Sequence, residues 1–310
     1  MPADWPRPFT FSWLAGRVGN GWGACNPGRT LRSLSGGSTL FILSCVPTLA
    51  IIDGDAGDDA RELRRSVVRI ESGDRTFCSG TLIGPALVLT AAHCVTTIAS
   101  MRVAVVDERF RTKRISVVRH VSHPSFAPGI APARQRGEDL ALLRLSQPLG
   151  HEFAPLSLVG RDVALPRHVI IAGFGAEPGL PSPGSQVLKT AQLVRFDDAR
   201  MATGTDLYVD PEGRGYRGGA GACRGDSGGP VLLRDPTDQS FSLVGVVSWA
   251  NRAVNDDANK PCGGVTASTP IARNLRWIQE VIRRLDAEDR SLRSSRKRQG
   301  SVPSGFAQPG

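Results

Sequence analysis

The chain has 310 residues, 40% of them hydrophobic, which is enough to bury at least one sizeable core and excludes disorder of the whole chain. Its formal net charge is +9, but the excess lies at the ends. Residues 1–50 hold four Arg and one acidic residue, and residues 291–310 hold four Lys or Arg and no acidic residue. Residues 51–290 hold thirty basic and twenty-eight acidic residues. This nearly balanced central part offers no phosphate-binding face, so we expect no nucleic-acid partner.

Residues 1–50 are interpreted as a secretory signal or pre-sequence. The apolar stretch Leu40–Ala50 follows several arginines and ends on a small residue, as signal peptides do. It is shorter than the roughly 18 residues of a membrane-spanning helix, and Pro47 interrupts it. We therefore expect secretion to an extracellular or periplasmic space without stable membrane association. A buried strand in the same stretch and a lipidation site at Cys45 are the alternatives.

The chain contains six cysteines, and removal of residues 1–50 would take away Cys25 and Cys45. Four cysteines would remain, an even number that suits disulfides in an oxidising compartment. They are Cys78, Cys94, Cys223 and Cys262.

After residue 50 the chain consists of short apolar runs separated by Gly, Pro, Asn or Asp. This texture is typical of strands and turns and predicts two packed β-barrels. The predicted strands lie in Ser66–Ile70, Thr81–Thr90, Val103–Val106, Ile115–Val118, Ala141–Leu145, Val169–Ile171, Val187–Val194, Val231–Leu233 and Leu243–Trp249.

The pattern changes to a helical period near the C-terminus. An amphipathic helix is predicted over residues 271–286, followed by a disordered, basic tail over residues 287–310. The apolar face of this helix consists of Ile271, Leu275, Ile278, Ile282 and Leu285.

Two residues that follow or open apolar strands are candidates for proton transfer. His93 stands at the end of Thr90-Ala91-Ala92-His93, and an imidazole can accept a proton at neutral pH and later return it. Asp139 opens the apolar run that follows it, and a carboxylate there can bind His Nδ1–H and fix the tautomer. Either residue alone would be interpreted as structural.

The third candidate is Ser227 within Gly225-Asp226-Ser227-Gly228-Gly229-Pro230. A serine hydroxyl is a poor nucleophile unless a base takes its proton and donors stabilise the developing oxyanion. Flanking glycines let backbone N–H groups turn toward one point, so we expect the N–H groups of Gly225 and Ser227 to form an oxyanion hole.

Together, His93, Asp139 and Ser227 in this chain order make the sequence resemble the chymotrypsin/trypsin family of serine proteases. The resemblance runs from Ile51 to about Leu285, through FCSGTLIGPALVLTAAHC, EDLALLRL, IAGFG, CRGDSGGPV and VGVVSW. It implies an all-β fold of two packed six-stranded antiparallel β-barrels, over residues 51–155 and 156–270, followed by the C-terminal α-helix. It also implies a serine endopeptidase that forms an acyl-enzyme on protein or peptide substrates, with no cofactor and no metal. We expect a monomer.

The resemblance implies several further roles. It pairs Cys78 with Cys94 and Cys223 with Cys262, and the small number of bridges suggests a bacterial-type member. It also implies that an amine at Ile51 pairs with Asp226 and orders the oxyanion hole. Signal cleavage after Ala50 would liberate that amine, so export and activation would be one step.

The substrate pocket is expected to be neutral. Trypsin-like members carry an Asp six residues before the nucleophile, and here that position is Gly221. With Ala250 and Gly264 it would line a pocket that prefers apolar or small P1 residues, unless Asp256 or Asp257 reaches it. The resemblance also implies that Ser248 supports Asp139. The stretch Ser248, Trp249 and Ala250 would then pair with the substrate backbone.

Other readings are weaker. A catalytically silent binding protein on the same fold, or a basic adaptor acting through its tail, are the rival functions. The tripeptide Arg224-Gly225-Asp226 matches a cell-adhesion motif, but Asp226 is expected to be buried. His120 and His123 have no third ligand nearby, so a strand-end turn is expected there rather than a metal site.

Overall fold

The structure is a computed structural model, and all the residues that it describes belong to the unit Pro47–Gly310. It describes residues 51, 54–72, 76–95, 100–107, 111–160, 167–175, 187–196, 204–212, 219–252 and 262–299. The predicted signal segment and the stretch that contains Asp256 and Asp257 lie outside these residues. No helix in the described part of the chain is both long and apolar enough to cross a membrane.

Six antiparallel strands form a first closed barrel in the order β1-β2-β3-β6-β5-β4. They are β1 (Val67–Ser72), β2 (Thr76–Gly84), β3 (Leu87–Thr90), β4 (Met101–Val106), β5 (Thr112–Ser122) and β6 (Ala141–Leu145). Strand β5 shows why the sequence folds this way, because Ile115 and Val117 are buried while Ser116 and Val118 face solvent.

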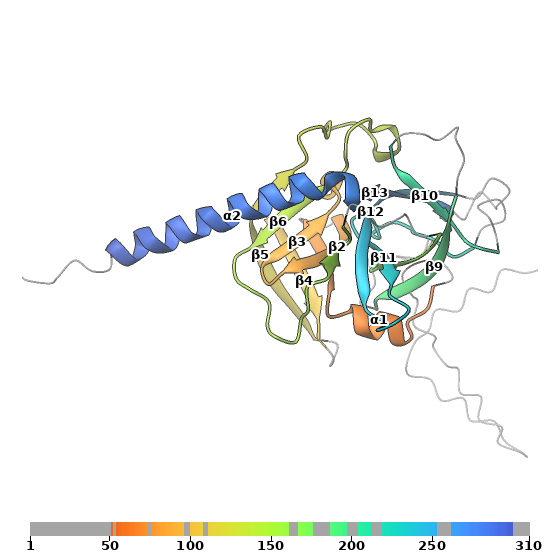
Figure 1. Cartoon of the computed structure of the whole chain (residues 1–310), viewed down its shortest axis with the longest axis horizontal. Helices are drawn as coiled ribbons and strands as arrows, with labels where there is room; N and C mark the ends of the chain where they lie inside the picture. Colours follow the sequence, from red (N-terminus) through yellow and green to blue (C-terminus); the bar gives the residue numbers. More distant parts are fainter. Residues whose placement is uncertain are drawn as a thin grey trace, which may run out of the picture. The chain divides into compact units, whose positions relative to one another are not determined.

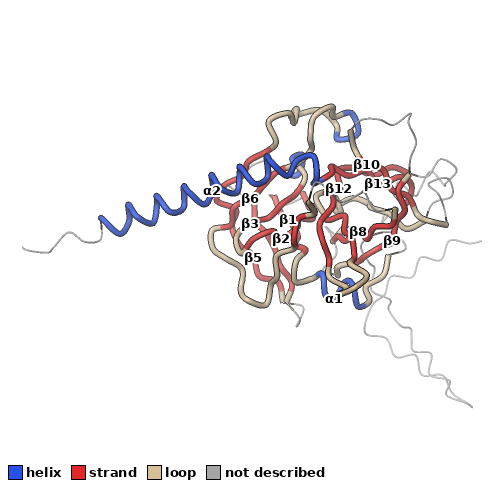
Figure 2. Tube along the Cα trace, in the orientation of Figure 1, coloured by secondary structure: helices blue, strands red, loops and turns tan. Residues whose placement is uncertain are grey.

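A second antiparallel barrel closes in the order β11-β8-β9-β10-β13-β12, with β12 pairing back to β11. Its strands are β8 (His168–Gly173), β9 (Lys189–Arg195), β10 (Asp206–Val209), β11 (Pro230–Arg234), β12 (Phe241–Arg252) and β13 (Gly263–Pro270). The short strand β7 (Ser157–Leu158) adds to β12 in parallel. Figures 1 and 2 show the two barrels, and the predicted fold class is confirmed.

One apolar cluster joins the two barrels. It includes Leu89 of β3, Ile170 of β8 and Leu243 of β12, all of them buried. A second cluster fills the second barrel around Ile171 and Tyr208. The barrels therefore share a packed interface, and groups from both can be held in fixed positions there.

The remaining described helical elements are α1 (Asp58–Leu63), the 3₁₀ turns η1 (Ala92–Cys94) and η3 (Pro132–Arg134), and the long helix α2 (Ile271–Gln299). The predicted apolar face of α2 is buried or half-buried. The predicted end at residue 286 is wrong, because the helix continues thirteen residues further. Residues 287–299 are therefore helical rather than a disordered tail, and residues 300–310 lie outside the described part.

Ion pairs with the first barrel explain why α2 extends past its apolar face. The buried Arg144 of β6 binds Asp286 at 2.6 Å and Asp289 at 3.4 Å. Arg119 of β5 pairs with Glu288. Asp286 lies at the predicted end, and Glu288 and Asp289 lie within one turn beyond it. Figure 1 shows α2 passing beside β5 and β6.

Candidate active site

Strand register brings His93 and Asp139 together. Thr90 at the end of β3 pairs with Ala141 at the start of β6, so the residues after β3 and before β6 meet at one end of the barrel. Asp139 Oδ2 lies 2.7 Å from His93 Nδ1, and Oδ1 accepts the backbone N–H of His93 at 2.9 Å. Both oxygens of the carboxylate are used to fix the position of the imidazole.

The carboxylate of Asp139 is buried, with 2% of the residue exposed. Ser248 Oγ donates to its Oδ2 at 2.5 Å, and Thr269 Oγ1 donates to its backbone carbonyl at 3.3 Å. Burial by itself raises the pKa of Asp139. The hydrogen bonds and charge of His93, together with the Ser248 hydroxyl, outweigh burial and hold the pKa below its ordinary value. Asp139 is therefore an ionised acceptor that can stabilise an imidazolium.

Ser227 lies on the irregular stretch between β10 and β11, at the junction of the barrels. Its carbonyl accepts the N–H of Ser79 from β2 at 2.8 Å, and its Oγ donates to the Ser248 carbonyl at 3.4 Å. Among the hydrogen bonds of the described residues, none joins Ser227 Oγ to the His93 ring. Ser248 thus contacts both Asp139 and Ser227.

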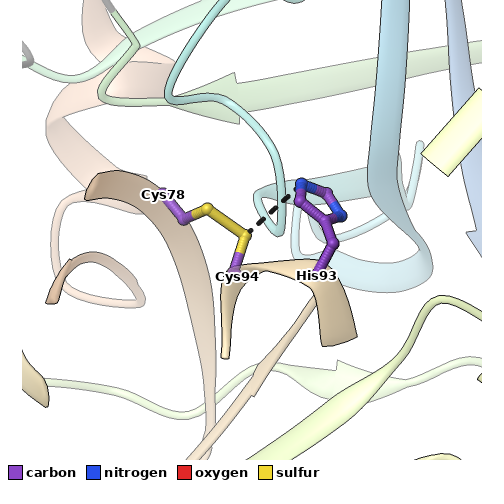
Figure 3. Close-up of side chains that lie close together, drawn as sticks. All are labelled: Cys78, His93 and Cys94. Carbon is purple, nitrogen blue, oxygen red and sulfur yellow. Dashed lines mark hydrogen bonds between the residues drawn. A yellow bond between two sulfur atoms is a disulfide. The ribbon is translucent and has the colours of Figure 1, made fainter. Parts of the chain in front are cut away.

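The Cys78–Cys94 disulfide lies beside the imidazole of His93, as Figure 3 shows. His93 Nε2 is 3.8 Å and the Ser227 carbonyl oxygen is 3.7 Å from Cys94 Sγ. The imidazole and the serine residue are therefore neighbours of one sulfur atom. Because the two sulfurs are bonded to each other, neither is a thiolate, and Cys78, His93 and Cys94 do not form a metal site.

The predicted disulfides are both present. Cys78 and Cys94 bridge β2 and η1, and Cys223 and Cys262 join the serine-bearing stretch to the start of β13. The pairing implied by the family resemblance is confirmed.

The predicted oxyanion donors are available. In the described part of the chain, neither the N–H of Gly225 nor that of Ser227 donates to a protein acceptor. Gly225 adopts φ +97°, and a Cβ there would lie 2.9 Å from Gly175 Cα, so only glycine fits. Its carbonyl is held by Ser79 Oγ at 2.9 Å, which in turn accepts the N–H of Phe174 at 3.0 Å.

The structure does not join Ile51 to Asp226. Ile51 is fully buried in the second barrel, but it is still bonded to Ala50 and carries an amide rather than an ammonium. Asp226 instead accepts the N–H of Gly175 at 2.8 Å and that of Cys223 at 2.9 Å. Burial raises the pKa of Asp226 to about 7, even though these two N–H groups and the charge of Lys189 lower it.

The predicted pocket residues lie close together. A Cβ at Gly221 would be 3.3 Å from Gly263 Cα and 3.5 Å from Thr266 Oγ1. Ala250 pairs with Thr266 across β12 and β13, so Ala250, Gly221 and the 263–266 stretch are neighbours. Beyond Val247, β12 pairs only with β13 among the described strands, which leaves the other edge at Ser248, Trp249 and Ala250 without a strand partner.

His120 and His123 do not converge on a ligand set. His120 lies within β5, and His123 Nδ1 is 2.8 Å from Ser125 Oγ while its ring packs edge-on against Trp277. Among the described residues, Cys78, His93 and Cys94 form the one close cluster of potential ligand residues, and its two sulfurs are bonded to each other. His120 lies in the strand, and His123 directly follows the end of β5.

Three residues that support the candidate site were not predicted from the sequence: Ser79, Thr269 and Lys189. Ser79 bonds the serine-bearing stretch, Thr269 bonds the Asp139 backbone, and Lys189 acts on Asp226. Ser79 follows Cys78 within the motif quoted above and could have been suspected from that position. No local sequence pattern distinguishes Thr269 or Lys189 from other strand residues.

Two closed six-stranded antiparallel barrels with a terminal helix form the trypsin-like fold. A sequence profile described as Trypsin matches residues 52–278. Kallikrein-15 from Saguinus oedipus is 32% identical over 232 residues, which is 68% of this chain and 83% of that protein. The chain belongs to the trypsin family of serine proteases.

Two longer relatives also match. Coagulation factor XII from Cavia porcellus is 31% identical over 230 residues, and serine protease 56 from Homo sapiens is 30% identical over 243 residues. These matches cover 66% and 73% of this chain but only 36% and 38% of the relatives, so the chain spans little more than a third of their lengths. Because the relatives named are animal proteins, they give no support to a bacterial-type member.

Proposed function

We propose that the chain is a serine endopeptidase in which Ser227 is the nucleophile, His93 the general base and Asp139 the residue that orients the histidine. The observation that carries this proposal is the 2.7 Å contact between the buried Asp139 carboxylate and His93 Nδ1. Beside it lies a serine whose stretch presents two N–H groups that have no acceptor among the described residues. Membership in the trypsin family supports it.

The proposed chemistry proceeds in two halves. Ser227 Oγ attacks the scissile carbonyl carbon as His93 Nε2 takes the hydroxyl proton, and the N–H groups of Gly225 and Ser227 bind the oxyanion. His93 then returns the proton to the leaving amine as the C–N bond breaks, which leaves an acyl ester on Ser227. Water deprotonated by His93 attacks that ester, and the proton passes back to Ser227 Oγ as the acid is released.

The Ser227 hydroxyl must rotate toward His93 Nε2 before the first proton transfer. In the structure it donates to the Ser248 carbonyl at a long 3.4 Å, so the bond that must be given up is weak. Rotation about Cα–Cβ between staggered positions costs little for a serine, and catalytic hydrogen bonds commonly tighten only when substrate is bound.

We propose that protein or peptide substrates bind as an added strand along the open edge of β12 at Ser248, Trp249 and Ala250. A neutral pocket of Gly221, Ala250 and Gly264 would receive an apolar or small P1 side chain. We further propose that the chain is secreted, that the signal is removed after Ala50, and that the resulting Ile51 ammonium approaches Asp226.

Labelling with a fluorophosphonate tests the catalytic proposal. Wild-type protein is expected to label, and Ser227→Ala is expected to stay folded, to remain unlabelled and to lose nearly all peptide hydrolysis. Absence of labelling in folded wild-type protein would favour a silent binding protein on this fold. Deletion of residues 287–310, which hold the basic residues of the predicted tail, should leave hydrolysis intact, whereas an adaptor acting through its tail would lose its function.

Two further measurements address the pocket and the start of the mature chain. Peptides with Phe, Leu, Ala and Arg at P1 should be cut in favour of the neutral residues, and a preference for Arg would refute the proposed pocket. N-terminal sequencing of secreted protein should begin at Ile51, and any other start would count against activation by signal cleavage.

A further inference from the structure

Lys189 is a buried cation within the second barrel. It lies on β9, 3% of the residue is exposed, and its Nζ donates to the Ile51 carbonyl at 3.1 Å. A lysine is almost never this deeply buried unless a partner offsets the loss of hydration. Its place next to Ile51, where the proposed activating cut would fall, suggests a role in activation.

The strand register places Lys189 on the same face as the carboxylate of Asp226. Lys189 pairs directly with Gly173 across β9 and β8, and side chains of directly paired residues point to the same face of a sheet. A Cβ at Gly173 would lie 2.1 Å from Asp226 Oδ1. The missing side chain of Gly173 thus makes room for the carboxylate on the face of the sheet to which Lys189 points.

The charge of Asp226 controls the stretch that carries Ser227. As a carboxylate it accepts N–H groups from Gly175 and Cys223 at once, which fixes the turn that leads to Gly225 and Ser227. Burial raises the pKa of Asp226 to about 7. Among the described ionisable side chains, Lys189 is the one whose charge lowers this pKa. A cation is therefore already present before any new N-terminus exists.

We propose that Lys189 is the resident cation of Asp226 in the uncut chain, and that it keeps the oxyanion hole ordered so that Ser227 is reactive before Ile51 is released. This inference rests on the proposed protease function. Cleavage before Ile51 would then add a second cation near Asp226 and make Lys189 dispensable, rather than convert an inert chain into an active one.

The test compares two forms of the protein. One is the full chain, with residues 1–50 confirmed by intact mass, and the other begins at Ile51 after a fused partner is removed directly before it. The measured quantity is the rate of fluorophosphonate labelling at Ser227. The uncut wild-type chain is expected to label within about tenfold of the cut chain.

Lys189→Met removes the charge but keeps an unbranched side chain of similar length. It is expected to lower labelling of the uncut chain by about tenfold or more and that of the cut chain by less than about threefold. Lys189→Arg should restore labelling of the uncut chain. The matched control is Lys113→Met, which removes an exposed lysine of β5 and should change neither form.

The outcomes separate the two proposals. If the cut wild-type chain labels and the uncut one does not, the inference is wrong while the protease proposal stands. An equal loss in both forms of Lys189→Met would show a purely structural role and would also overturn the inference. If neither wild-type form labels, the protease proposal itself fails. Thermal unfolding shows whether Lys189→Met is folded, and if it is not, the wild-type comparison alone decides.

Discussion

The two barrels contribute to the site in different ways. The first barrel supplies His93 and Asp139 directly beside the paired ends of β3 and β6. The second barrel supplies Ser227 on a stretch without regular structure, whose shape depends on a glycine with φ +97° and on the buried Asp226.

This difference indicates where control can act. The proposed base and its carboxylate lie beside paired strand ends of the first barrel, which persist as long as the barrel is folded. The proposed nucleophile and oxyanion donors depend on one buried charge and its surroundings, which a cut, a cation or a change in pH can alter. We therefore expect a regulatory change to act through the second barrel rather than through the first.

Asp139→Asn should cause the largest loss. The amide no longer holds the imidazole in the tautomer that accepts the Ser227 proton, so we expect kcat to fall by roughly 10⁴-fold with little change in fold. Steady-state hydrolysis and thermal unfolding measure the two effects. Glu138→Gln, one residue earlier, is the matched control and should stay within about threefold of wild type. A comparable loss in both variants would contradict the assigned role of Asp139.

Asp226 should make stability depend on pH. Its pKa is about 7 in the folded chain against an ordinary value of 3.8, so the protonated form favours folding. That stabilisation is fully present below pH 3.8 and is lost as pH rises through about 7.

Asp226→Asn removes this dependence. Between pH 4 and pH 8 the stability of Asp226→Asn should improve relative to wild type by roughly 4 kcal/mol, measured by denaturant unfolding of the uncut chain. Labelling of Ser227 should fall in the same variant, because the amide cannot accept both N–H groups. A stability difference that is the same at all pH values would contradict the unusual pKa of Asp226.

Ser248→Ala tests the contact between the barrels at Asp139. It removes the 2.5 Å hydrogen bond from Ser248 Oγ to the carboxylate, and hydrogen bonds to charged groups contribute about 1.5–3 kcal/mol. We expect kcat to fall by about 10- to 100-fold. Ser242→Ala on the same strand is the control, and equal kcat in both variants would show that the contact does not assist catalysis.

Ser79→Ala should have the smallest effect. The hydroxyl bonds the Gly225 carbonyl and accepts the Phe174 N–H, so its loss should cost about 1 kcal/mol of stability and slow labelling about threefold. Exposed Ser116 on β5 offers a matched Ser→Ala control. If labelling were unchanged while stability fell, Ser79 would support the fold without shaping the oxyanion hole.

Much of this arrangement was predictable from the sequence. Apolar runs such as Ala141–Leu145 coincide with strands. The predicted run Thr81–Thr90 is not one strand, because it holds the second half of β2, a turn and then β3. The helical face of α2 was predictable because five apolar residues repeat at a helical period.

Other elements could not be predicted from the local sequence pattern. Strand β13 consists mainly of Gly, Thr, Ser and Ala, with Val265 as its one large apolar residue, and it is a strand because β10 and β12 pair with its two edges. The part of α2 after Leu285 is mainly polar, and the ion pairs of Asp286 and Glu288 with β6 and β5 depend on the tertiary fold. The local sequence shows Lys189 as an ordinary strand lysine, and only its pairing with Gly173 places it on the same face of the sheet as Asp226.

The most direct measurement is an experimental structure of the protein after reaction with a fluorophosphonate. We expect the phosphorus on Ser227 Oγ and a phosphoryl oxygen about 2.7–3.1 Å from the N–H groups of Gly225 and Ser227, with His93 Nε2 facing the adduct. An adduct on another residue, or a phosphoryl oxygen directed away from both N–H groups, would contradict the account.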